Sequence, residues 1–202
     1  MLFFYQPILG GAIMESLFIK LAKYPIIETE RLVLRPVTLD DAEAMFEYAS
    51  NQENTRYTFP TNQSLEETKN NIAQFYLANP LGRWGIELKS TGEFIGTIDL
   101  HKLDAVIKKA AIGYIINQKY WNRGFTTEAN RAVIELAFEK IGMNKLDAFY
   151  DKDNPASGKV MEKSGMSFSH EEPYARMDKN ETGRIVTDVH YVLTKEDYFA
   201  NK

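Results

Sequence analysis

The loop of residues 122–127 combines residue types that suit the binding of an anion. A strand-like run precedes it, and apolar residues at every fourth position from Ala129 predict a helix that stops at Gly142. The loop therefore opens the first turn of a helix. Backbone N–H groups there have no partner within the helix and lie at its positive dipole end, which suits a phosphate group. Gly124 permits close approach of the backbone to the anion.

A second chemical pattern begins at Asn154-Pro155. Asn is a favoured N-cap and Pro a favoured first helical residue, so the pair predicts a helix that runs to Ser164 and stops at Gly165. An ordinary capped helix accounts for both residues without a ligand. Ser157, at the third helical position, adds a hydroxyl donor near the start of this helix.

The two segments resemble motifs of the GNAT acetyltransferases. The run Trp-Asn-Arg-Gly-Phe-Thr at residues 121–126 is similar to the family's pyrophosphate loop, Arg/Gln-x-x-Gly-x-Gly/Ala. The longer run Tyr-Trp-x-Arg-Gly-Phe-x-Thr-Glu-Ala resembles the RimJ/RimL-like group, which acetylates the N-terminal amine of ribosomal proteins. Residues 154–165 resemble the family's Asn-Pro-Ala-Ser-x-x-Val-x-Glu-Lys-x-Gly stretch, and residues 29–36 its opening Thr-Glu-Arg-Leu-x-Leu-Arg-Pro. The resemblance covers the chain from Ile27 to Thr194.

The resemblance implies an α+β fold, a single GNAT-like domain over residues 26–202 with a mixed, mostly antiparallel twisted sheet flanked by helices. It also implies acetyl-CoA as co-substrate, direct attack by an amine, and no metal. In the family, the loop binds the pyrophosphate, the strand before it pairs with the pantetheine amides, and the Asn of the second motif contacts the pantetheine arm. The cofactor-binding residues implied here are Ile115, Ile116, Asn117, Arg123, Gly124, Phe125, Thr126, Thr127, Asn154 and Ser157. Among the strand amides, that of Ile115 is the candidate for polarising the thioester carbonyl.

The sequence departs from the family at several chemical positions. Trp121 stands where Arg or Gln is usual, and Thr126 stands at the second small-residue position of the loop. Met161 occupies the place of the family's general-acid Tyr, which leaves Ser157 as the candidate to protonate the departing thiolate. Ala111 occupies the place of the usual base Glu. The remaining candidates for the base are Asp99, Glu171, Glu172, His101, His170 and His190, or a relay of water to bulk solvent.

The acceptor implied by the branch resemblance is the α-amino group of a protein or peptide, such as a ribosomal protein. Two alternatives stay open: an acetyltransferase of small amines, such as an amino acid, a polyamine or an antibiotic, and a GNAT-fold protein that binds an acyl-CoA without turnover. The aromatic residues Tyr57, Phe59 and Trp84 are candidates for the acceptor groove. Lys159 and Lys163, one helical turn apart, are candidates for the cofactor's adenosine phosphates.

Composition excludes several other classes. The 202 residues contain 44% hydrophobic and 26% charged residues, which suits one globular domain. The net charge of -4 gives no general attraction to nucleic acid. There is no Cys, so disulfides, thiolate metal sites and a Cys nucleophile are excluded. The three His residues lack metal-ligand spacing along the sequence. We expect a cytoplasmic monomer or homodimer.

Residues 1–25 are expected to be an N-terminal extension. Its first 14 residues are apolar but contain Pro7 and a Gly-Gly pair, and they are too few to span a bilayer. No Lys or Arg precedes the apolar part, so the segment is a poor signal peptide. The expectation is an extension that is frayed or lies on the surface, with no membrane partner.

Overall fold

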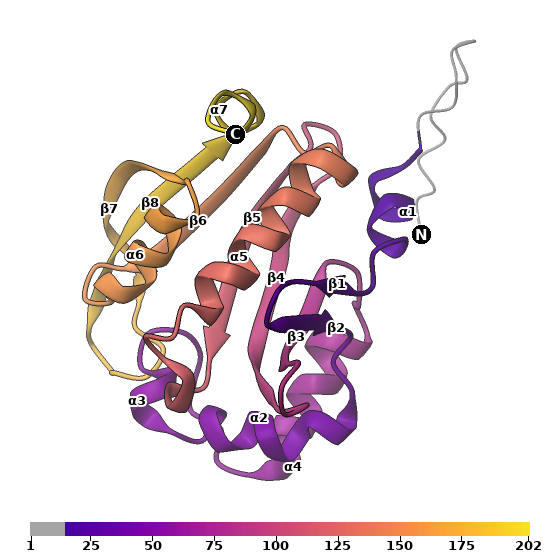
Figure 1. The fold of residues 1–202 in the computed structure, drawn as a ribbon. Coiled ribbons are helices and arrows are strands. Elements are labelled where there is room, and N and C mark those ends of the chain that lie inside the picture. The colour runs from indigo at the N-terminus through magenta and orange to yellow at the C-terminus, as the bar shows by residue number, and fades with distance from the viewer. Residues whose placement is uncertain (1–14) are drawn as a thin grey trace, which may run out of the picture.

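The computed structural model describes residues 15–202, which form one sheet with helices on both faces (Figure 1). The sheet has eight strands in the order β1-β2-β3-β4-β5-β6-β8-β7, and every neighbouring pair is antiparallel except β5 with β6. The predicted α+β architecture is therefore confirmed. The strands are β1 (Ile27–Glu28), β2 (Leu32–Arg35), β3 (Arg83–Leu88), β4 (Phe94–Asp104), β5 (Lys109–Ile116), β6 (Lys145–Asp151), β7 (Ser167–Met177) and β8 (Ile185–Thr194).

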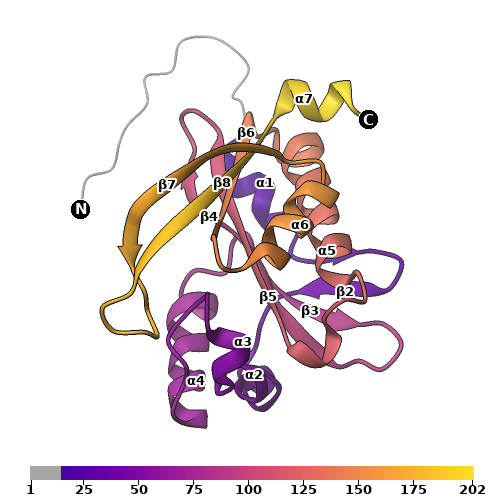
Figure 2. The same cartoon turned by 90° about the vertical axis from the view of Figure 1, so that its left-hand side faces the viewer.

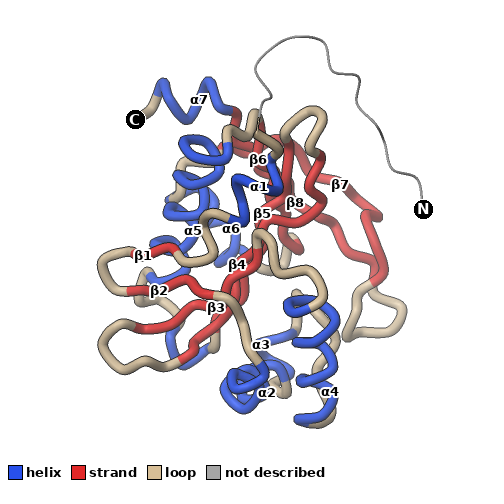
Figure 3. The backbone as a smooth tube through the Cα atoms, turned by 90° about the vertical axis from the view of Figure 1, so that its right-hand side faces the viewer, coloured by secondary structure: helices blue, strands red, loops and turns tan. Residues whose placement is uncertain are grey.

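Helices cover the two faces of the sheet unequally (Figures 2 and 3). One face carries α5 and α6, and the other carries α2, α3 and α4 over its lower part only. The α-helices are α1 (Leu17–Ala22), α2 (Ala42–Ala49), α3 (Gln52–Thr55), α4 (Leu65–Asn71), α5 (Phe125–Glu135), α6 (Pro155–Lys163) and α7 (Lys195–Ala200). Wider helical turns continue α4 through Ile72–Leu77 and α5 through Leu136–Ile141, where Gly142 adopts φ +81° and ends the helix. No helix in this described part is long and apolar enough to cross a membrane.

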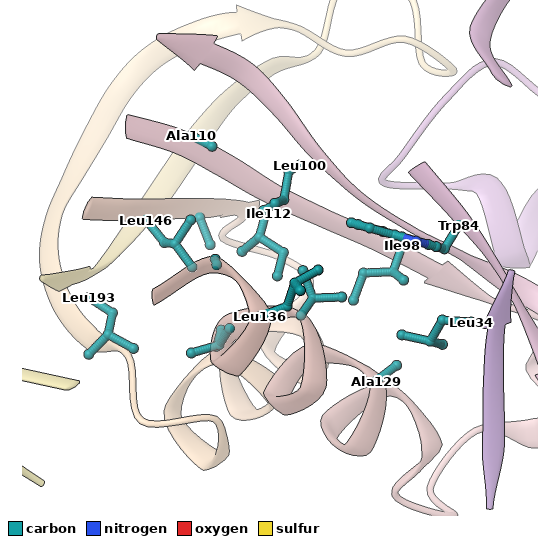
Figure 4. Packing of buried hydrophobic residues seen from close by; sticks show 14 of the residues in the cluster. Leu34, Trp84, Ile98, Leu100, Ala110, Ile112, Ala129, Leu136, Leu146 and Leu193 are labelled. Atoms are coloured by element: carbon teal, nitrogen blue, oxygen red, sulfur yellow. The ribbon is translucent and has the colours of Figure 1, made fainter. Parts of the chain in front are cut away.

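The main core lies between α5 and the centre of the sheet (Figure 4). Ala129 and Leu136 of α5 pack with Leu34, Ile98 and Ile112 of the strands beneath. This packing is what places the start of α5, and with it the loop of residues 122–127, against the end of β5.

Trp84 belongs to this core and does not line a groove. Its side chain is 2% exposed, and its indole Nε1 donates to the Tyr24 carbonyl oxygen at 3.3 Å. The expectation that Trp84 contacts the acceptor is therefore wrong, because strand β3 directs the ring into the main core, where its one polar atom is already paired.

Helix α1 was not foreseen. Ser16 caps it by accepting a hydrogen bond from the Ile19 N–H, and Leu17 and Leu21 are buried in the main core. Part of the predicted extension thus contributes to the fold, whereas residues 1–14 lie outside the described residues. A second short helix, α3, is capped by Asn51, whose side-chain oxygen accepts from the N–H groups of Glu53 and Asn54.

Candidate functional site

Strands β5 and β6 separate half-way along their length. They pair only through Lys109–Ala111 and Lys145–Asp147, although β5 continues to Ile116 and β6 to Asp151. Beyond Ala111, the edge of β5 that faces β6 has no neighbouring strand in the part of the chain that the structure describes (Figure 1). An opening of this kind in the middle of a sheet exposes backbone groups that an extended ligand can pair with.

The pairing with β4 determines which peptide groups face the opening. The Asn117 N–H donates to the Ile95 carbonyl of β4 at 2.8 Å, so residues of the same strand phase, including Ile115, direct their N–H and C=O groups to β4. The groups of Tyr114 and Ile116, which lie beyond the last pairing with β6, therefore point into the opening. The Ile116 carbonyl already accepts from the Asn54 side chain at 3.1 Å and from the Trp121 indole at 2.9 Å.

The strand phase contradicts the cofactor-binding roles that the sequence predicted for two residues, Ile115 and Asn117. The Ile115 amide is turned towards β4 and cannot polarise a carbonyl in the opening. Asn117 is 3% exposed; its C=O accepts from Tyr120, and its side-chain oxygen accepts from the Lys119 N–H. Asn117 thus closes the strand and starts the next turn. Ile116 has a free N–H that points into the opening. The N–H of Tyr114 points the same way, which adds Tyr114 to the candidate cofactor-binding residues.

The loop of residues 122–127 presents a run of unpaired donors. Within the described residues, none of its six backbone N–H groups donates to a protein acceptor. Asn122 at φ +60° and Gly124 at φ +80° bend the backbone into this shape. Because few side chains tolerate such a φ, replacing Gly124 strains the loop itself, and loss of binding in such a variant would not separate contact from distortion.

Arg31, in the turn between β1 and β2, supports this loop. Its guanidinium donates to the Arg123 carbonyl at 3.0 Å and to Glu128 at 2.6 Å, and it lies 4.4 Å from the centre of the Phe125 ring. Burial opposes ionisation of Glu128, but hydrogen bonds from Thr29 and Arg31 outweigh it and lower the pKa of this carboxyl. The Arg31–Glu128 pair joins the Thr-Glu-Arg-Leu and Gly-Phe-Thr-Thr-Glu segments, which the sequence shows only as separate motifs.

The start of α6 faces the same opening. Asn154 is the N-cap residue, but its side chain makes no cap hydrogen bond and is left available. The Tyr114 hydroxyl donates to the Ser157 carbonyl at 2.9 Å, and the Ser157 hydroxyl donates back to Tyr114 at 3.3 Å. Burial raises the pKa of Tyr114, so this phenol stays protonated. Tyr114 was not among the residues predicted from the sequence, although its place in the strand before the loop could have indicated it.

Asn130 is a buried amide without a partner. Its side chain is fully buried, and neither its oxygen nor its nitrogen has a hydrogen bond with any of residues 15–202. On α5 it stands four residues after Thr126 and three before buried Val133, on the side of the helix that faces the sheet. A buried amide without a hydrogen bond lowers the free energy of unfolding by about 1–3 kcal/mol, so its presence here indicates a functional role.

Among the candidate bases, His101 and Asp99 form a pair that lies over β5, beside the opening. The His101 Nδ1 lies 2.7 Å from an Asp99 carboxylate oxygen. The ring packs over Gly113 of β5, where an added Cβ would lie 3.1 Å from the His101 ring. Elsewhere, Glu171 pairs with Lys152, and Glu172 with His190. Lys159 and Lys163 are exposed, and Tyr57 and Phe59 are half-buried.

Comparison with known proteins agrees with this geometry. Residues 31–167 match the model of an acetyltransferase (GNAT) domain. The uncharacterized N-acetyltransferase YoaA of Bacillus subtilis is 40% identical over 146 residues, which cover 70% of this chain and 82% of that protein. YdaF of the same organism, provisionally named a ribosomal N-acetyltransferase, is 35% identical over 58% of this chain and 64% of that protein.

A solved structure shares the fold at lower identity. Spermidine N-acetyltransferase from Vibrio cholerae, in complex with CoA and spermine, is 17% identical with a TM-score of 0.72, covering 85% of this chain and 99% of that chain. The family model spans most of the chain, and YoaA is matched over most of its own length. The chain therefore belongs to the GNAT acetyltransferases, and it is an N-acetyltransferase.

Proposed function

We propose that this enzyme transfers acetyl from acetyl-CoA to the α-amino group of a protein or peptide by direct attack of the amine. The observation that carries the proposal is the opening between β5 and β6, which ends at a loop with six unpaired N–H groups. An extended amide chain with a pyrophosphate at one end fits both features together.

The cofactor is held by backbone groups first. We assign the pyrophosphate to the N–H groups of residues 123–127 and the pantetheine amides to the free edge at Tyr114 and Ile116. The unpaired side chains of Asn154 and Asn130 supply further amide contacts along the arm. The acetyl carbonyl then meets a strand N–H of the opening, which stabilises the charge that develops on its oxygen.

The Asn130 assignment predicts opposite effects on stability and on binding. In Asn130→Leu an apolar side chain of similar size replaces the unpaired amide, so we expect a higher unfolding midpoint. We also expect the acetyl-CoA dissociation constant to rise about tenfold, which corresponds to about 1.4 kcal/mol. Thermal melts and calorimetric titration measure both. Ile134→Leu, one turn along the same helix, is the matched control for repacking alone. Unchanged affinity in a stabilised Asn130→Leu protein would contradict the assignment.

We assign the general base to His101. Asp99 accepts the Nδ1 proton at 2.7 Å, which fixes the tautomer in which Nε2 is free to take a proton. The pair is about two-thirds buried and lies on the face of the sheet that helices leave open. The amine therefore approaches from that face, loses its proton towards Nε2, and attacks the thioester held in the opening. We assign protonation of the leaving thiolate to the Ser157 hydroxyl.

The acceptor assignment rests on proton chemistry and on the relatives. An α-amine has a pKa of about 8, against above 10 for Lys, so more of it is neutral near pH 7. Ala111 stands where the family usually has a base Glu, so an acceptor that is already neutral, and needs less help to lose a proton, suits this chain best. The similarity to YdaF agrees with a protein N-terminus. The fold shared with a spermidine N-acetyltransferase keeps small amines as the second candidate.

Matched peptides test the acceptor. We expect acetylation of a peptide with a free N-terminus and no Lys to exceed that of an N-terminally blocked peptide that contains Lys. The rate should climb with pH through the α-amine pKa of about 8, because the neutral fraction of the amine grows over that range. Mass spectrometry locates the acetyl group and thiol release gives the rate. Preferential modification of the blocked peptide overturns the assignment. Activity on polyamines or amino acids alone would identify a small amine, the second candidate, as the acceptor.

A further inference from the structure

Three potential metal ligands converge on the β7–β8 hairpin. In the register of these strands, His170 lies opposite His190, and Glu172 follows two residues later on β7. One ligand atom from each lies within 4.8 Å of the other two. His170 and His190 are separated by 20 residues in the sequence, which is why ligand spacing did not reveal the cluster.

A β-bulge at Ser169 creates this arrangement. Phe168 pairs with Tyr191 and packs edge-on against its ring, yet His170, two residues on, pairs with the adjacent His190. Ser169 is thus the extra residue, and it turns His170 to the opposite face from Phe168. Without the bulge, strand alternation would leave Phe168 and His170 on one face. Bulges of this kind commonly re-aim a side chain that has a function.

Neighbouring side chains hold the two imidazoles in place. The His170 and His190 rings are parallel, with centres 4.4 Å apart, and Phe149 of β6 stacks on His190 at 5.6 Å. The Ser169 hydroxyl lies 3.0 Å from His170 Nδ1, which leaves Nε2 as the free nitrogen of that ring. His190 Nε2 already lies 3.1 Å from a Glu172 carboxylate oxygen.

We propose that His170, His190 and Glu172 form a binding site for one divalent transition-metal ion of the zinc class. Two imidazoles and one carboxylate are a ligand set typical of Zn²⁺, with a fourth position left for water. Ligand bonds of about 2.0–2.2 Å require the three atoms to draw closer by roughly 1 Å. Each imidazole reaches its in-plane position by turning about χ2, a torsion with broad wells. The Ser169 hydroxyl then acts as the outer partner that orients His170.

The chain provides its own control, because it contains only three His residues. Untagged protein, stripped with a chelator, is titrated calorimetrically with Zn²⁺, and Co²⁺ gives a visible absorption spectrum. We expect one ion per chain. His170→Gln and His190→Gln should each weaken binding at least tenfold, whereas His101→Gln should leave it unchanged. Thermal melts should show metal-dependent stabilisation that disappears in the two hairpin variants.

Two results overturn the proposal. Zn²⁺ binding that persists at wild-type strength in the folded His170→Gln, His190→Gln double variant places the ion elsewhere. Absence of both binding heat and a cobalt spectrum in the wild-type protein means that the stacked rings serve packing only. Neither result bears on acetyl transfer, because the hairpin ligands take no part in the proposed reaction.

Discussion

His101→Gln is expected to lower the turnover number by about 10²–10⁴-fold, the usual contribution of a general base. The amide keeps much of the shape of the imidazole and can still reach Asp99, but it cannot accept the amine proton at neutral pH. Binding of acetyl-CoA should stay unchanged, because His101 belongs to β4 and packs over Gly113 on the acceptor face of the sheet, away from the loop of residues 122–127. Steady-state kinetics with a peptide acceptor and calorimetric titration of the cofactor measure the two quantities.

Two further variants separate base catalysis from a structural role. Asp99→Asn preserves the packing but weakens the hold on the His101 tautomer, so a smaller loss in turnover is expected. In His101→Ala, added imidazole should restore part of the rate, because a free imidazole can enter the space left beside Gly113. Full activity in His101→Gln would show that the amine loses its proton to water, and the assignment of His101 would then be wrong.

Ser157→Ala is expected to lower the turnover number by one to two orders of magnitude while the acetyl-CoA dissociation constant changes little. This pattern marks an interaction made mainly in the transition state. The physical reason is that Met161 cannot donate a proton and the Tyr114 proton is engaged by the Ser157 carbonyl at 2.9 Å. Pre-steady-state and steady-state thiol release give the rate, and equilibrium titration gives the affinity.

Tyr114→Phe is the matched control for this prediction. It removes the hydroxyl that accepts from Ser157 but keeps the ring in the core, so it should affect turnover less than Ser157→Ala does. If the order is reversed, the phenol is the proton donor and Ser157 only orients it. If neither variant slows turnover, the thiolate leaves without help from either hydroxyl.

Much of the fold was accessible from the sequence, because its signals are local. The predicted cap at Asn154 and the predicted stops at Gly142 and Gly165 correspond to observed helix ends, and the period of four from Ala129 lies within an observed helix. Helix α1 was missed because six residues give no usable period, and its burial depends on packing of Leu17 and Leu21 against distant strands. Its only local signal was Ser16 before an apolar pair.

The site could be predicted from the sequence only in part, because the sequence does not show which peptide groups of β5 face β4 and which face the opening. β5 is largely buried on both faces, so alternation of polar and apolar residues does not tell which peptide groups face β4. That is why Ile115 and Asn117 were chosen, whereas the register leaves Tyr114 and Ile116 free. Asp99 and His101 stand two apart on one strand, so a period of two could have paired them in advance. The Arg31–Glu128 contact spans 97 residues and carries no local signal.

The central claim is that the opening beside β5 and the loop of residues 122–127 hold acetyl-CoA through backbone groups. Hydrogen–deuterium exchange with and without CoA tests it most directly, because those N–H groups have no protein acceptor in the described structure. We predict fast exchange in the free enzyme, and strong protection on binding in residues 122–127 and at Tyr114 and Ile116. Binding of CoA that leaves these amides unprotected, or that protects another surface instead, would contradict the account.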